Sequence, residues 1–208
     1  MIKNRSILII YKIIFGFLAL SALITEVIAL VHDGRFYPGN FFSYFTVEAN
    51  SFATIMFLIS AWVLARNRKT GSLEKWRGAS TLYMVTTGIV FAVLLSGYDS
   101  GVLTAVPWDN TVLHYIIPIA ALLDWIIDPP TMRIPFKKAL YWLLCPIAYV
   151  IYSLVRGRAT GWYPYPFLSP AKHGYLGVAI TSLGVAAIVL MITWILLRLP
   201  VRRTLKHR

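Results

Sequence analysis

The chain has 208 residues, of which 58% are hydrophobic and 13% are charged, and its formal net charge is +12. It is too apolar for a soluble domain, because its hydrophobic residues also lie in long runs. A single cysteine, Cys145, excludes an internal disulfide. The chain has no phosphate loop, dinucleotide fingerprint or paired-cysteine motif, so we expect neither a cofactor nor a metal.

Six apolar runs are long enough to cross the hydrocarbon core of a bilayer, which needs roughly 20 residues each. They cover residues 7–31, 41–65, 77–97, 110–128, 137–155 and 175–199. The connections between the runs are short, which leaves no room for a separate soluble domain. We therefore expect residues 1–208 to form one all-α domain, a polytopic membrane protein with six transmembrane helices.

The positive charge alternates between the two ends of these runs. Sixteen of the 20 Lys and Arg residues fall at the two termini and in the second and fourth connections, and four fall in the other connections. This positive-inside asymmetry predicts that both termini are cytoplasmic. The basic residues would then lie beside anionic lipid headgroups, so the net charge requires no nucleic-acid partner.

Polar residues inside the apolar runs mark candidate site residues, because an unpaired polar group is costly in hydrocarbon. The first run carries Glu26 near its outer end, and the second opens with FFSYFTVEAN, which contains Thr46, Glu48 and Asn50. Thr46 and Asn50 are four residues apart and share a helix face. A purely structural interpretation stays open, in which Thr46 bonds a carbonyl one turn back and Asn50 joins two helices.

The fourth run contains His114, the only histidine inside an apolar run, within LHYIIPIAALLDW. Thr46 and His114 lie about the same number of residues from the outer ends of their runs, so at about 1.5 Å per residue we expect them at matching depth. Pro118 deprives the His114 carbonyl of its helical partner and predicts a kink. Asp124 lies deeper. The structural alternative is a proline bend in which His114 bonds a neighbouring helix.

The third connection carries two acids and no base, and the fifth, RGRATGWYPYPFLSPAKHGY, is rich in aromatic residues and proline. The prolines argue against a helix, and the aromatic residues make the segment too apolar for a free linker. We expect it to form a lid or substrate mouth over the outer end of the bundle. Four of its aromatic residues, which lie close together in the sequence, would form this lid: Trp162, Tyr163, Tyr165 and Phe167.

A threonine hydroxyl becomes a useful nucleophile when a base takes its proton, and imidazole is the usual base. Thr46 and His114 could therefore attack the ester carbonyl of a lipid in the outer leaflet, with water reaching the acyl intermediate from an outer-facing cavity. Asn50 or a backbone N–H of the lid could stabilise the oxyanion. Glu26 could orient His114.

Three motifs resemble those of the androgen-induced and androgen-dependent TFPI-regulating protein family, and the chain is more similar to the bacterial branch. They are YFT at residues 44–46 with Asn50 downstream, the spacing from His114 through Pro118 to Asp124 and Trp125, and YPF at residues 165–167. Together they span most of the chain, from the second run to the start of the sixth.

This resemblance implies a multipass hydrolase of fatty acid esters of hydroxy fatty acids, located in the bacterial inner (plasma) membrane. Its essential threonine and histidine fall on Thr46 and His114. Glu48 is a departure from the animal proteins, and a carboxylate beside Thr46 would disfavour an anionic substrate headgroup.

A small transporter or proton-coupled carrier is the alternative function. Its relay of ionisable groups would be Glu26, Glu48, His114 and Asp124, all of which would matter, whereas the hydrolase needs chiefly Thr46 and His114. A haem or metal carrier is a third class, disfavoured because one histidine alone lies within the apolar runs.

Overall fold

A computed structural model of the chain describes residues 4–68, 71–97, 104–199 and 201. Most of these residues are helical, and none of them lies in a β-strand. Among them, six helical segments are long and apolar enough to cross a membrane. The segments are Arg5–His32, Phe45–Ala65, Leu73–Leu95, Pro107–Ile127, Phe136–Thr160 and Pro170–Arg198. The expected all-α architecture with six helices of membrane-spanning length is confirmed for the described residues, and each apolar run falls on one segment.

The segments are assembled from short and long helices. In chain order the elements are α1 (Arg5–His32), α2 (Pro38–Phe41), α3 (Phe45–Ala65), α4 (Leu73–Val90), η1 (Phe91–Leu95), α6 (Pro107–Thr111), η2 (Val112–Ile116), α7 (Ile117–Ile127), α8 (Phe136–Ala139), η3 (Leu140–Leu143), α9 (Leu144–Thr160), η4 (Pro166–Leu168) and α10 (Pro170–Arg198). Gly174 interrupts α10 with a left-handed φ of 67°, so the regular part of that helix begins where the sixth apolar run begins.

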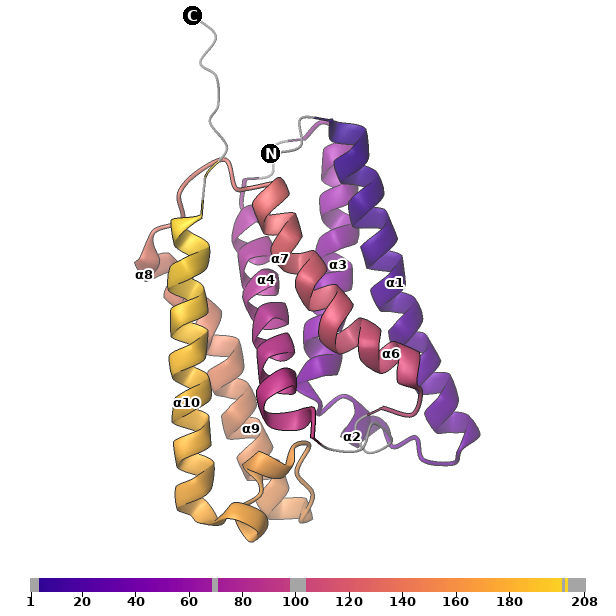
Figure 1. Cartoon of the computed structure of the whole chain (residues 1–208), viewed down its shortest axis with the longest axis vertical. Coiled ribbons are helices and arrows are strands. Elements are labelled where there is room, and N and C mark those ends of the chain that lie inside the picture. Colours follow the sequence, from indigo (N-terminus) through magenta and orange to yellow (C-terminus); the bar gives the residue numbers. More distant parts are fainter. Residues whose placement is uncertain (1–3, 69–70, 98–103, 200, 202–208) are drawn as a thin grey trace, which may run out of the picture.

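The long helices pack against one another in pairs. α1 lies along α3, α7 lies along α4, and α3 and α4 also touch, while α10 contacts α4 from the other side (Figure 1). Gly16 lets the backbones of α1 and α3 approach closely, since a Cβ there would lie 2.8 Å from Leu58 Cδ2 of α3. The Arg5 end of α1 and the Arg198 end of α10 lie at the same end of the bundle, and α2 lies at the opposite end (Figure 1).

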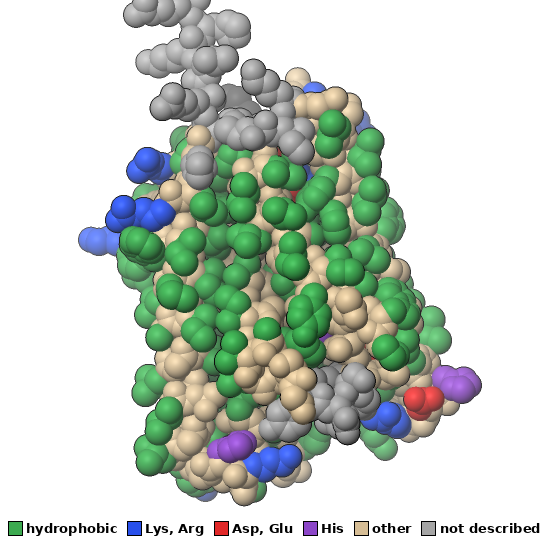
Figure 2. Space-filling view, viewed as in Figure 1, with side chains coloured by type: hydrophobic (Ala, Val, Ile, Leu, Met, Phe, Trp, Pro, Cys, Tyr) green, Lys and Arg blue, Asp and Glu red, His purple; other side chains and the backbone are tan. Residues whose placement is uncertain are grey.

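The outside of the bundle is apolar along its length. Large hydrophobic side chains of α9 and α10, such as Ile151, Val155 and Leu183, are exposed. Figure 2 shows hydrophobic side chains over much of the visible face, with Lys and Arg toward the two ends. A soluble protein would bury such residues, so this is the surface expected of helices surrounded by lipid.

Two basic residues counted among the sixteen lie inside the bundle rather than in loops. Lys12 of α1 and Arg77 of α4 are buried, and both form ion pairs with Asp124 of α7. The Arg77 guanidinium lies 2.7 Å from Asp124, and Asp128 lies 3.1 Å from Lys12 and 3.3 Å from Arg77. This cluster of two cations and two anions joins three helices. Hydropathy alone does not reveal it, because its partners are far apart in sequence.

Six others of the sixteen lie outside the described residues: Lys3, Lys69, Arg202, Arg203, Lys206 and Arg208. Of the two acids expected in the third connection, Asp99 also lies outside them. The other, Asp109, is not in a loop. It belongs to α6 and is completely buried, because the fourth membrane-spanning segment begins at Pro107, earlier than its apolar run indicated.

Two π-helical turns, η1 and η2, interrupt the third and fourth spans beside one another. The kink expected at Pro118 takes the form of η2, in which Ile117 N–H bonds the carbonyl of Val112, five residues back. In the same register the Leu113 carbonyl would bond residue 118, but proline has no N–H. Gly88 allows α4 to pack closely against Pro118, since a Cβ at residue 88 would lie 3.0 Å from Pro118 Cβ.

Candidate active site

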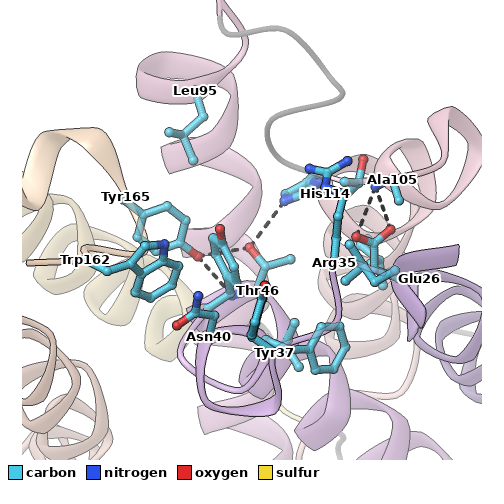
Figure 3. Close-up of a pocket in the computed structure, with 16 residues that line it drawn as sticks. Glu26, Arg35, Tyr37, Asn40, Thr46, Leu95, Ala105, His114, Trp162 and Tyr165 are labelled. Carbon is cyan, nitrogen blue, oxygen red and sulfur yellow. Dashed lines mark hydrogen bonds between the residues drawn. The ribbon is translucent and has the colours of Figure 1, made fainter. Parts of the chain in front are cut away.

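Thr46 and His114 meet inside the bundle. Thr46 is the second residue of α3 and His114 lies in η2, and Thr46 Oγ1 is 3.2 Å from His114 Nε2. Both side chains are buried. The expectation that the two residues lie at matching depth is confirmed, and the structure adds that they face each other (Figure 3).

The imidazole is held in the tautomer that a base requires. His114 Nδ1 lies 3.1 Å from the carbonyl oxygen of Asn110, one turn back. A carbonyl oxygen can only accept a hydrogen bond, so Nδ1 carries the proton and Nε2 of the neutral ring has a free lone pair. The Thr46 hydroxyl therefore donates to Nε2. Phe91 of η1 stacks on the imidazole with ring centroids 4.0 Å apart, which fixes the plane of the ring.

Tyr165 contacts the same threonine from the opposite side. Its phenol oxygen lies 3.2 Å from both the backbone nitrogen and Oγ1 of Thr46. The Thr46 N–H donates to the phenol oxygen, and the Thr46 hydroxyl proton is directed at His114, so the phenol proton points at Thr46 Oγ1. Burial raises the pKa of Tyr165 to about 12, so this donor is retained at neutral pH.

The position of Thr46 in its helix also favours negative charge on its oxygen. Thr46 lies in the first turn of α3, where the helix dipole creates a positive potential. A base, a neutral hydrogen-bond donor and a helix amino terminus thus surround one hydroxyl. This arrangement can activate a nucleophile and stabilise the anion that forms when the hydroxyl reacts.

Asn50 positions the threonine and the histidine rather than facing the reaction. Its Nδ2 donates to the carbonyl of Thr46 at 2.9 Å and to the carbonyl of Leu113 at 3.1 Å. The second bond satisfies the carbonyl that Pro118 leaves without a partner in η2. Both amide protons are used and the residue is fully buried. Asn50 is therefore not the oxyanion donor that the sequence suggested, and it ties α3 to η2 instead.

The Thr46 hydroxyl borders two cavities. The first, of about 140 Å³, has polar and charged groups in its wall, among them Glu26 and Arg35. In Figure 3, Thr46 lies between Tyr165 and His114, with Trp162 beyond Tyr165 and Glu26 beyond His114. The second cavity, of about 70 Å³, is mostly apolar and lies between α4, α9 and α10. Thr46, Leu95 and Tyr165 line both cavities.

Glu26 lines the first cavity but does not orient His114. Its two carboxylate oxygens accept the backbone N–H of Ala105 at 3.0 and 2.9 Å. It also interacts electrostatically with the buried carboxyl group of Asp109. Both imidazole nitrogens of His114 are already occupied, so the orienting acceptor is the Asn110 carbonyl. Sequence analysis missed Asp109, Asn110 and Phe91, because none of them stands out by residue type or spacing.

The other two acids proposed as supporting residues lie away from Thr46. Glu48 is exposed on α3 and does not line the first cavity, since it points to a different side of the helix from Thr46. Asp124 belongs to the buried ion cluster with Lys12 and Arg77. The structure therefore brings together Thr46, His114, Asn50 and Tyr165, and leaves Glu48 and Asp124 outside the group.

The four aromatic residues of the connection between α9 and α10 contact different parts of the structure. Trp162 and Tyr165 line the first cavity, while Phe167 stacks on Tyr165 and lines the second. Tyr163 packs on Gly157 of α9. The segment is shorter than expected, because α9 continues to Thr160 and α10 starts at Pro170. Its position beside the cavity is that of the expected mouth.

No family model, curated protein or solved structure matches this chain. The site geometry is therefore the basis for assigning a function.

Substituting leucine for Asn50 is expected to lower the free energy of unfolding by about 1–3 kcal/mol, because the Leu113 carbonyl would be buried without a donor. Thr54→Val on the same helix is the matched control. It removes a buried hydroxyl that makes no hydrogen bond and should change stability by less than about 0.5 kcal/mol. Thermal unfolding in detergent measures both, and equal midpoints would contradict this role of Asn50.

Gly157→Ala is expected to loosen the aromatic connection, since a Cβ at this position would lie 2.1 Å from Cε1 of Tyr163. The ring must move, and chymotrypsin should then cut faster after Trp162 or Phe167. Gly184→Ala on α10 is the control, because a Cβ there meets no atom within 4 Å. Unchanged cleavage in Gly157→Ala would show that Tyr163 does not hold this segment against α9.

Proposed function

We propose that this protein is an intramembrane hydrolase of lipid esters in which Thr46 is the nucleophile and His114 the general base. The observation that carries the proposal is the 3.2 Å contact between Thr46 Oγ1 and His114 Nε2, with Nδ1 held by the Asn110 carbonyl. The same two residues are those on which the motif resemblance places the essential pair. The substrates are fatty acid esters of hydroxy fatty acids or related acyl esters.

In the first half of the reaction Thr46 Oγ1 forms a bond to the ester carbonyl carbon as its proton passes to His114 Nε2. The carbonyl oxygen becomes an oxyanion, and the Tyr165 phenol, which contacts Thr46 Oγ1, is the side-chain donor that would stabilise it. When the bond to the leaving alcohol breaks, that oxygen takes the proton from His114. The acyl group is left on Thr46.

In the second half a water molecule attacks the acyl-threonine. His114 removes a proton from the water, and the collapse of the tetrahedral intermediate returns this proton to Thr46 Oγ1. The products are a carboxylic acid and the restored hydroxyl. The first cavity, whose wall is polar, is the side from which water would arrive.

The two cavities match the two parts of such a substrate. The apolar cavity between α4, α9 and α10 suits an acyl chain, and the polar cavity suits the more hydrophilic part. Arg35 lines the polar cavity and Glu48 does not. The carboxylate of Glu48 therefore does not oppose an anionic group there, contrary to the expectation from its place beside Thr46.

We further propose that both termini are cytoplasmic and that the site opens toward the outer leaflet of a bacterial inner membrane. The support is the excess of Lys and Arg in alternate segments. Thr46 lies in the first turn of α3, and α3 begins at the end of the bundle away from the Arg5 end of α1 (Figure 1). The transporter alternative gains no support, because Asp124 is tied up in ion pairs and Glu48 is exposed, so the proposed relay is not continuous.

Fluorophosphonate labelling of the purified protein in detergent tests the proposal. An activated Thr46 hydroxyl would displace fluoride and form a bond to phosphorus. We expect labelling of the wild type on the peptide that contains Thr46, and none in Thr46→Ala or His114→Ala. Labelling that persists in folded Thr46→Ala, or no labelling of the folded wild type, would refute a nucleophilic Thr46 and make proton-flux assays the next step.

A further inference from the structure

An apolar gap between α9 and α10 runs from the outside of the bundle toward Thr46. Its outer part is a groove of about 380 Å³ lined by residues of both helices, including Leu154 and Val178. Its inner part is the apolar cavity of about 70 Å³. Val150 of α9 and Ser182 of α10 line both parts. The groove and the cavity are therefore neighbouring parts of one path.

The inner end of this path is the candidate nucleophile. Thr46 and Tyr165 line the apolar cavity as well as the polar one. A chain that filled the groove and the apolar cavity would bring its polar end to the Thr46 hydroxyl. The polar cavity would remain free for water and for the leaving alcohol.

The path has the polarity of an amphiphile lying in a leaflet. Arg158, in the last turn of α9, is the one charged side chain among the described residues that line the outer groove. Deeper along the helices the wall consists of residues such as Val150, Val185 and Val189. Hydrocarbon is thus favoured deeper along α9 and α10, and a charged or polar group is favoured near the ends of these helices.

We propose that the gap between α9 and α10 is a lateral portal through which the acyl chain of an ester in the surrounding leaflet reaches Thr46. This inference rests on the proposed hydrolase function. It assigns separate routes to the two reactants: the long-chain ester comes sideways from the membrane, and water comes through the polar cavity.

A reversible block at Ser182 tests the portal. Ser182 Oγ is buried and makes no hydrogen bond, so Ser182→Cys removes none. The variant is made in a Cys145→Ser background, since Cys145 is the only native cysteine and is exposed. Benzyl methanethiosulfonate then places a ring in the gap, and dithiothreitol removes it. Leu183→Cys is the matched control, because Leu183 is 70% exposed on the same helix and lines neither part of the path.

Two esters separate the two routes: 4-nitrophenyl palmitate in phosphatidylcholine vesicles and water-soluble 4-nitrophenyl acetate. We expect the modified Ser182→Cys protein to lose at least about tenfold in kcat/KM for the palmitate and to keep its rate for the acetate. Dithiothreitol should restore the loss, and modified Leu183→Cys should show none.

Three results would overturn the portal. The modified Ser182→Cys protein could hydrolyse the palmitate at its original rate, it could lose both activities equally, or Leu183→Cys could respond in the same way. If the proposed hydrolase function itself is wrong, the result is different: the unmodified protein would hydrolyse neither ester. That result would also refute the portal.

Discussion

Thr46→Ala is expected to lower kcat for ester hydrolysis by at least about 10³-fold, because among the described residues no other side-chain hydroxyl group hydrogen-bonds His114. His114→Ala should lose a similar factor, since Thr46 would keep its proton. The double variant should be hardly worse than either single one, because the two residues act as a unit. Thr46→Ser keeps the nucleophilic oxygen and should retain part of the rate.

Thr54→Ala is the matched control for these variants. Thr54 is a second buried threonine of α3, and its hydroxyl makes no hydrogen bond. Release of 4-nitrophenol from the acetate ester, with protein folding checked by thermal unfolding, measures all the variants. The nucleophile assignment would be wrong if Thr46→Ala and Thr54→Ala hydrolysed the ester at the same rate.

Asp124→Leu should cost about 3–5 kcal/mol of folding free energy, the cost of leaving buried charges without a counter-ion. Lys12 and Arg77 both form ion pairs with Asp124, and both are buried. The loss should appear as a lower unfolding midpoint in detergent, while the protein that remains folded keeps its rate per molecule. The second part separates a structural role for Asp124 from the supporting catalytic role that sequence analysis allowed.

A charge-balanced variant isolates the cause of that loss. Lys12→Met combined with Asp124→Leu removes one cation with one anion and leaves Arg77 beside Asp128, 3.3 Å away. It should be more stable than Asp124→Leu alone, because fewer unpaired charges stay buried. Asp33→Asn, in the exposed loop after α1, should change stability little. A double variant as unstable as Asp124→Leu would show that packing, rather than charge pairing, dominates at this site.

The part of the site that could be predicted from the sequence depends on helix position and depth. Thr46 and His114 follow the starts of the second and fourth apolar runs, which run in the same direction, by similar numbers of residues, and that is enough to put them at one level. Pro118 likewise predicted an irregular helix, because the lack of a backbone N–H is a local property of proline. These inferences needed only the rise per residue and the directions of the helices.

Helix rotation and long-range contacts decided the rest. Asn50 resembles a catalytic donor in sequence, yet its amide bonds the Leu113 carbonyl, 63 residues away. Tyr165, 119 residues from Thr46, reaches that threonine through the path of the α9–α10 connection. Asp124 forms an ion pair with Lys12, which is 112 residues away in the sequence. The periodicity of hydrophobic residues along the sequence does not reveal such partners.

The amino-acid sequence alone determined the six membrane-length helices found in the described part of the chain, because the length of an apolar run is a local property and the bilayer sets the length required. It also placed Thr46 and His114 at one depth. Only the tertiary structure decided that the two side chains face each other, that Tyr165 completes their hydrogen-bond network, and that α9 and α10 leave an apolar gap. These features depend on how each helix is rotated about its axis, which is set by side-chain packing across the whole bundle.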